Sequence, residues 1–173
     1  MLRSARIEDV RQIHRLLSFF ADKGLLLGRS LHSLYDQVRD FKVMVEGETE
    51  SMAGDGRMVE RVIGVGALHI CWEDLAEIRS LAVDEEFQGR GVGATLVRSF
   101  LDEARGFGIR RVFTLTYQPG FFQKLGFCTI DKGQLPHKVW SDCINCPKFP
   151  DCNEEALVWD QWDETGPSPA RSA

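Results

Sequence analysis

A glycine-rich segment at residues 88–93, Gln-Gly-Arg-Gly-Val-Gly, has the composition and spacing of a phosphate-binding turn. It follows an apolar, strand-like run at residues 78–83 and precedes a helical pattern at residues 94–104. The first N–H groups of a helix have no acceptor inside that helix, and the helix dipole adds positive charge there. Glycines let the backbone come close to a ligand. The segment therefore predicts an anion site suited to phosphate.

The class of phosphate ligand is narrowed by what the turn lacks. A Walker loop ends in Gly-Lys-Ser or Gly-Lys-Thr, whereas this turn ends in Gly91-Val92-Gly93. A dinucleotide fingerprint has its third glycine one position later, where this chain has Ala94. Neither nucleotide motif fits, and a turn that needs glycines only for its own shape is the alternative interpretation.

Composition limits the class of protein. The chain has 173 residues, 43% hydrophobic and 27% charged, as expected for a soluble globular domain. No apolar run has the roughly 20 residues needed to span a bilayer, and the first residues lack a signal-peptide core. The net charge of −5 argues against a general nucleic-acid surface. We expect a cytoplasmic protein that binds neither membranes nor nucleic acid and uses particular Arg or Lys residues for any anionic substrate.

Hydrophobic periodicity predicts helices interspersed with strands. Helices are expected at residues 7–23, 31–40, 94–104 and 120–125, and strands at residues 41–46, 59–70, 75–83, 111–116, 127–130 and 156–159. Residues 47–56 are expected to be a hairpin loop, and residues 163–173 a disordered tail after one domain at 1–162. This order predicts an α/β (α+β) domain, a mixed sheet between helices, with ligand bound where the strand before the glycine turn ends.

Five cysteines raise the question of a metal site. Cys143, Cys146 and Cys152 could supply three thiolates to zinc. A fourth ligand would have to be one of three residues: His137, Cys128 or Asp151. A structural zinc site usually shows two clear ligand pairs, and the second pair is missing here. Reduced structural thiols are therefore the favoured interpretation, and we predict no metal.

The glycine turn also resembles that of a known family. The pattern Gln-x-x-Gly-x-Gly after a strand ending in Leu-Ala-Val is similar to the pyrophosphate loop of the GNAT acyltransferase superfamily, and residues 121–127 resemble its closing helix and strand. The resemblance implies a mixed, mostly antiparallel sheet with acetyl-CoA as co-substrate in the sheet cleft. The implied coenzyme contacts are Leu81, Ala82, Val83, Gln88, Gly89, Arg90, Gly91, Val92, Gly93, Ala94 and Phe122. In the family this position often holds a tyrosine that acts as the general acid. Phe122 has no hydroxyl group, so we expect it only to pack beside the coenzyme.

Further segments narrow the resemblance to the short, single-domain bacterial N-acetylglutamate synthases. They are residues 24–30, 77–83, 104–109, 112–116, 135–140 and 143–149. The resemblance implies transfer of an acetyl group from acetyl-CoA to the α-amine of L-glutamate, the first step of arginine biosynthesis. By analogy with the family, a homodimer is also expected.

The implied reaction needs a general base, because an ammonium group must lose a proton before its nitrogen can attack. Glu77, a carboxylate in an apolar strand just before the turn, is the candidate, and a plain ion pair with Arg79 is its alternative role. Strict strand alternation predicts that Leu81 shares the face of Glu77 and Arg79, whereas Ser80 and Ala82 point to the other face.

The leaving thiolate needs a proton or a hydrogen bond. The resemblance implies Thr116 as the donor, with Tyr117 as the second candidate and strand-end packing as the alternative role of both. Backbone N–H groups at the Ala82–Val83 end of the strand would polarise the thioester carbonyl.

Glutamate has two carboxylates, and each favours a charged donor. The resemblance places Arg29 at one carboxylate, with backbone from Leu27 and Ser80 nearby, and Lys148 at the other. A solvated surface position is the alternative for Lys148.

Two other functions remain open: a GNAT N-acetyltransferase for another amino acid or a protein amine, and a non-catalytic acyl-CoA sensor.

Overall fold

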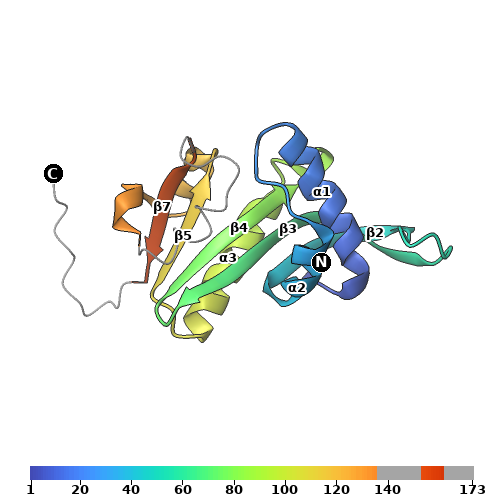
Figure 1. The fold of residues 1–173 in the computed structure, drawn as a ribbon, viewed down its shortest axis with the longest axis horizontal. Coiled ribbons are helices and arrows are strands. Elements are labelled where there is room, and N and C mark those ends of the chain that lie inside the picture. The colour runs from blue at the N-terminus through green and yellow to red at the C-terminus, as the bar shows by residue number, and fades with distance from the viewer. Residues whose placement is uncertain (136–152, 162–173) are drawn as a thin grey trace.

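The computed structural model describes residues 1–135 and 153–161. Within these ranges a single seven-stranded sheet has the order β1-β2-β3-β4-β5-β7-β6 (Figure 1). Its strands are β1 (Leu2–Ser4), β2 (Phe41–Glu50), β3 (Met58–Trp72), β4 (Leu75–Val83), β5 (Arg111–Thr116), β6 (Cys128–Ile130) and β7 (Glu155–Asp160). β4 and β5 are parallel and the other neighbouring pairs are antiparallel. The predicted mixed, mostly antiparallel sheet is confirmed.

Helices cover both faces of this sheet (Figure 1). They are α1 (Val10–Asp22), α2 (Leu31–Asp36), α3 (Val92–Gly106) and α4 (Pro119–Gln123), with short 3-10 helices η1 (Ile7–Asp9), η2 (Val38–Asp40), η3 (Glu85–Phe87) and η4 (Lys132–Gln134). The apolar stripe of α1 packs with β2 and β3 in one core cluster. α3 and α4 pack on the opposite face in another cluster, which contains Phe100 and Phe122. None of the helices in the described part of the chain is long and apolar enough to cross a bilayer.

Two glycines of β3 let α3 lie close against the sheet. A Cβ atom at Gly64 would come within 2.7 Å of Val92, and one at Gly66 within 2.8 Å of the Phe100 ring. Lys42 in β2 holds the same helix, because its Nζ donates to Ser99 Oγ at 2.7 Å and pairs with Glu103 at 2.7 Å. The position of α3, and so of the glycine turn at its N-terminus, is therefore fixed by direct contact with the sheet.

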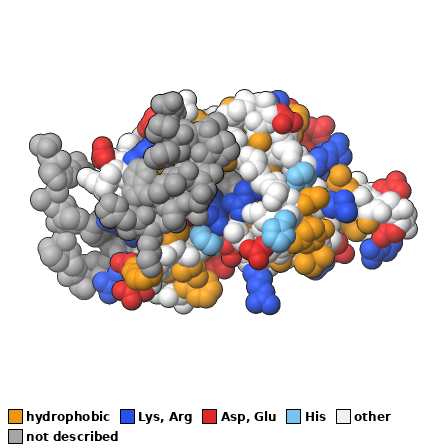
Figure 2. All heavy atoms as spheres, in the orientation of Figure 1, with side chains coloured by type: hydrophobic (Ala, Val, Ile, Leu, Met, Phe, Trp, Pro, Cys, Tyr) orange, Lys and Arg blue, Asp and Glu red, His pale blue; other side chains and the backbone are white. Residues whose placement is uncertain are grey.

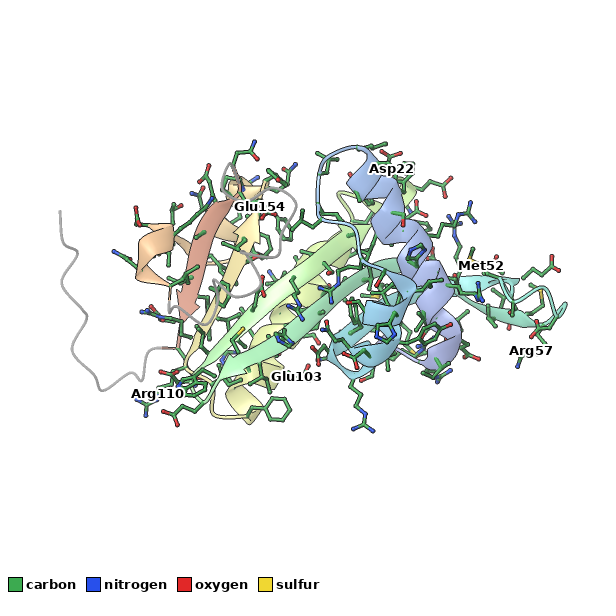
Figure 3. All side chains as sticks on the ribbon, in the orientation of Figure 1. Asp22, Met52, Arg57, Glu103, Arg110 and Glu154 are labelled. Carbon is green, nitrogen blue, oxygen red and sulfur yellow. The ribbon has the colours of Figure 1, made fainter. Side chains whose placement is uncertain are left out.

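Several element boundaries differ from the prediction. β1 was missed, since its three residues carry no periodic signal and are set by pairing with β2. β2 continues to Glu50 through the predicted loop. The register shifts between Val45 and Glu48, where Gly47 adopts a φ of 62°, and pairing with β3 then resumes. The resulting hairpin projects from the body of the protein, with Met52 and Arg57 near its tip (Figure 3). The predicted tail at 163–173 lies outside the described residues.

The predicted alternation along β4 is wrong beyond Arg79. Leu81 packs with Ile78 against α3, whereas Ala82 joins the cluster under α1. The cause is a β-bulge. Val65 pairs with Ala82 and Ala67 pairs with Arg79, so between these pairs one residue of β3 lies opposite two residues of β4. Ser80 lies in this bulge with a left-handed φ of 53°. Glu77 and Arg79 still share one face, as predicted.

We expect Gly66→Ala to lower the free energy of unfolding by about 1–3 kcal/mol, because the added methyl group meets a fully buried ring. Urea denaturation measures the change. Gly106→Ala at the end of α3 is the control, since nothing lies within 4 Å of its Cβ position. Equal losses in both variants would contradict the close-packing explanation.

Candidate active site

The sheet opens between its two parallel strands. β4 and β5 pair only at Leu75–Arg111, Ala76–Val112 and Glu77–Phe113, and beyond that point they diverge (Figure 1). The divergence leaves a cavity of about 1090 Å³, bounded by the ends of both strands, the start of α3 and the segment before α2. The cavity thus lies at the end of the strand before the glycine turn, where the sequence predicted that ligand would bind.

The cavity brings together most of the residues singled out from the sequence. Its lining includes Leu27, Arg29, Glu77, Ser80, Leu81, Ala82, Val83, Gln88, Gly89, Gly91, Val92, Gly93, Ala94, Thr116, Tyr117 and Phe122. Arg90 does not line it, and its guanidinium instead lies 5.2 Å from the centre of the Phe87 ring. Lys148 lies outside the described residues.

The glycine turn has the geometry of an anion cradle. Gly89 and Gly91 adopt left-handed φ angles of 74° and 82°, and nothing lies within 4 Å of their Cβ positions. Thr95 N donates to Gly91 O at 2.9 Å, so the N–H groups of Val92, Gly93 and Ala94 precede the first helical bond. These donors lie on the cavity wall at the positive end of a 15-residue helix. The open space over the glycines fits a pyrophosphate.

Aromatic rings close the cavity near this cradle. Phe122 is 3% exposed and packs edge-to-face with Phe127 at 5.2 Å between ring centres, so it belongs to the core as well as to the cavity wall. Phe121, which sequence reasoning passed over, lies over the helix start, because a Cβ at Gly93 would come within 3.2 Å of its ring. No sequence signal distinguishes the two adjacent phenylalanines.

The three acidic residues directly before the cradle are partly neutralised by ion pairs with two basic residues. Arg61 pairs with Glu86 at 3.0 Å and with Asp84 at 3.1 Å, and these hydrogen bonds raise the pKa of Arg61 above its usual value. Lys23 pairs with Glu85 at 2.6 Å. The pairs reduce the repulsion that an approaching phosphate would meet.

Glu77 stands where β4 and β5 separate. It is the last β4 residue paired with β5, and its side chain is 15% exposed. Arg79 Nη1 lies 3.5 Å from Glu77 Oε2, so the ion pair weighed as an alternative role is present. Because Glu77 also lines the cavity, the ion pair does not exclude contact with a ligand.

Polar side chains from β4 and from residues in and around α2 line another part of the cavity, called here the acceptor wall. Arg29 Nη2 donates to Ser33 Oγ at 2.9 Å and also to Gln37 Oε1, which accepts a second bond from Arg79 Nη2 at 2.9 Å. Sequence reasoning missed Gln37 and treated Arg79 only as an ion-pair partner. The spacing of four residues from Arg29 to Ser33 to Gln37, across a predicted helix, is the signal that could have found it. In the view of Figure 2, Lys and Arg side chains lie near the centre of the visible face of the molecule, beside the residues drawn in grey.

Two hydroxyl groups follow β5 at the other edge of the cavity. Thr116 Oγ1 accepts a hydrogen bond from Gln118 N at 3.0 Å, which leaves its own hydrogen able to donate elsewhere. Tyr117 lines the same edge. Across this edge lies Glu154, just before β7 (Figure 3), which also lines the cavity.

The zinc hypothesis concerns residues mostly outside the described part of the chain. These are His137, Cys143, Cys146, Asp151 and Cys152. Cys128 is described and lies exposed in β6. Among the described residues no cluster of three or more metal-ligating side chains occurs.

The sheet is opened between two parallel strands, and the cavity there is lined by the glycine cradle, by the ion-paired Glu77 and Arg79, and by Arg29. This arrangement has room for a phosphate-bearing ligand beside a group of charged side chains. Comparison with known proteins identifies the class. Residues 26–127 match the Acetyltransferase (GNAT) family, and the chain belongs to that family.

Three relatives extend this match. The chain is 38% identical to an uncharacterized N-acetyltransferase of Chlorobaculum tepidum, over 91% of this chain and 94% of the other. It is 37% identical to an amino-acid acetyltransferase of Mycobacterium tuberculosis, over 82% of this chain and 76% of the other. N-acetylglutamate synthase from Neisseria gonorrhoeae, complexed with coenzyme A and N-acetyl-glutamate, superposes with a TM-score of 0.77 at 28% identity, over 92% of this chain and 34% of the other.

The chain is therefore an N-acetyltransferase with acetyl-CoA as its co-substrate. The open cradle at Gly89 and Gly91 fits the pyrophosphate of the coenzyme, and the gap between β4 and β5 leads from that cradle to Glu77.

We expect Gly91→Ala to weaken coenzyme A binding about tenfold or more, because a side chain at a left-handed position strains the cradle and fills the space over it. Isothermal titration with coenzyme A measures the effect. Gly108→Ala is a matched control, since Gly108 has a φ of 76° and equally open space after the other end of α3. Both variants should lose a similar amount of folding stability. Equal affinity of the two variants for coenzyme A would contradict the cradle assignment.

Proposed function

We propose that this protein transfers the acetyl group of acetyl-CoA to the α-amine of L-glutamate, the first step of arginine biosynthesis. The observation that carries the proposal is the position of Glu77, at the separation of β4 and β5, in a cavity that the cradle and Arg29 also line. The relatives support it, since one is named an amino-acid acetyltransferase and another was crystallised with N-acetyl-glutamate. A cytoplasmic location and a homodimer accompany the proposal by analogy with the family.

In this mechanism Glu77 accepts a proton from the ammonium group of the amino acid. The freed nitrogen attacks the thioester carbonyl carbon, forming the N–C bond as the C–S bond breaks. Arg79 Nη1, 3.5 Å from Glu77 Oε2, helps to hold the carboxylate in place in the cavity. Backbone N–H groups along the β4 edge that no longer faces β5, including the Ala82–Val83 end, stabilise the carbonyl oxygen as it gains charge.

Thr116 donates a hydrogen bond to the departing sulfur, and the second proton, which the nitrogen loses after attack, passes through this hydroxyl to the sulfur to give the CoA thiol. Its oxygen already accepts the Gln118 N–H, so its hydrogen is directed away from that bond, and the residue lines the cavity. Tyr117 is the second candidate at the same edge. Phe122, buried in the core and lacking a hydroxyl, takes no part in proton transfer.

Arg29 binds one carboxylate of glutamate. Its guanidinium is held on the cavity wall by Ser33 and Gln37, so little side-chain freedom is lost when a carboxylate binds. Leu27 and Ser80 line the same cavity, and their backbone is proposed to contact the substrate there.

Release of the CoA thiol from acetyl-CoA, measured across a panel of free amino acids, tests the proposal. We expect a strong response to L-glutamate and a weak one to L-aspartate, whose shorter side chain cannot reach both carboxylate sites. A response to a different amino acid would replace the proposed acceptor. Silence with every amino acid, while acetyl-CoA still binds, would favour a protein amine or a sensor role.

We expect Glu77→Gln to lower kcat by about 10²–10⁴-fold, because the amide keeps the shape of the carboxylate and cannot accept the proton. The affinity for coenzyme A should stay near that of the native protein. Glu103→Gln is the control, since it removes an ion pair with Lys42 away from the cavity. Full activity of the Glu77 variant would overturn its assignment as the base.

A further inference from the structure

Two guanidinium groups meet at one uncharged oxygen on the acceptor wall of the cavity. Arg29, before α2, and Arg79, in β4, both donate through Nη2 to Oε1 of Gln37. All three residues line the cavity, and Gln37 is the C-cap of α2. Like charges repel, and the neutral amide oxygen cancels neither charge. A carboxylate oxygen at the same point would bind both groups more strongly, because hydrogen bonds to a charged acceptor are about twice as strong as neutral ones.

We propose that Arg29 and Arg79 form a two-arginine clamp for the α-carboxylate of the acceptor amino acid, one oxygen of which displaces Gln37 Oε1 as their shared acceptor. The inference rests on the proposed function for the identity of that amino acid. It gives Arg79 a role in substrate binding beyond its ion pair with Glu77.

The position of the base selects the α-carboxylate over the side-chain carboxylate. In an amino acid the amine and the α-carboxylate are attached to the same carbon, so their binding groups must be neighbours. Arg79 Nη1 lies 3.5 Å from Glu77 Oε2, and the two residues share one face of β4. The side-chain carboxylate of glutamate lies further from the amine and needs a separate donor.

The charge around the cavity agrees with this assignment. Although the chain has a net charge of −5, its described cavity-lining residues include three basic side chains and two acidic ones. They are Arg29, Arg79 and Lys132, against Glu77 and Glu154. The clamp therefore favours free amino acids over amines that lack an α-carboxylate.

The first test compares L-glutamate with 4-aminobutanoate, which differs from it only by the missing α-carboxylate. We expect Arg79→Gln to lower kcat/KM for L-glutamate about tenfold or more beyond its effect on 4-aminobutanoate, mainly through KM, because both substrates share any loss at Glu77 and only L-glutamate loses a contact to the clamp. L-glutamine, which keeps the α-carboxylate, should lose as much as L-glutamate. Equal losses for 4-aminobutanoate and L-glutamate would overturn the clamp and return Arg79 to a structural role.

The second test places a tethered carboxylate in the clamp. We expect Gln37→Glu to raise KM for L-glutamate about tenfold or more while KM for acetyl-CoA stays unchanged. Gln134→Glu is the matched control, because it adds the same charge at an exposed residue of η4 outside the cavity lining. An unchanged KM for L-glutamate in the Gln37 variant, or an equal rise in the control, would overturn the proposal.

The clamp and the proposed function can fail separately. Acetylation of another α-amino acid in place of glutamate would overturn the proposed function, and both variants would then be measured with that acid and its decarboxylated amine. Acetylation of L-glutamate and 4-aminobutanoate with equal efficiency by the native protein would overturn the clamp alone.

Discussion

The short parallel contact between β4 and β5 is the constraint on which the site depends. β4 is tied to β3 along its whole length, and β5 is tied to β7 from Arg111 to Thr116. Each strand follows the twist of its own antiparallel partner, so the two can pair only near their amino ends. The left-handed conformation of Ser80, which costs about 1–3 kcal/mol, is held by the ladder on either side of it. The cavity exists because the antiparallel pairings outweigh an extension of the parallel one.

In the proposed function the cavity binds two anionic ligands by different means. The coenzyme meets backbone N–H groups and a helix dipole, and the nearby acidic residues are partly neutralised by Arg61 and Lys23. The proposed acceptor meets guanidinium groups held by Ser33 and Gln37. Backbone donors carry no full charge. The cavity can therefore bind a diphosphate and an amino acid without the repulsion that more cationic side chains in one cleft would cause.

Local patterns were sufficient to predict the parts of the site that depend on neighbouring residues. The glycine turn, the strand before it and the helix after it follow from spacing. The candidate role of Glu77 follows from its place in an apolar strand together with the reaction that the family resemblance implies. The bulge at Ser80 could not be predicted, because it arises from the register with β3 and not from the residues of β4. Gln37 was missed for a similar reason, since Arg79 reaches it from a strand 42 residues away in the chain. Residues brought together by tertiary contacts were recoverable only where the family resemblance supplied them.

The absence of a side chain at Gly64 links the interior of the sheet to the coenzyme. The space that a Cβ would need there is taken by Val92 and Leu96, in the first turns of α3. That helix start also presents the N–H groups of the cradle. Any enlargement at this position would push the donors outward from the sheet, so its effect would reach acetyl-CoA as well as the core. Position 64 therefore acts as a spacer that sets the depth of the phosphate site, and a change there couples folding stability to catalysis although the residue does not line the cavity.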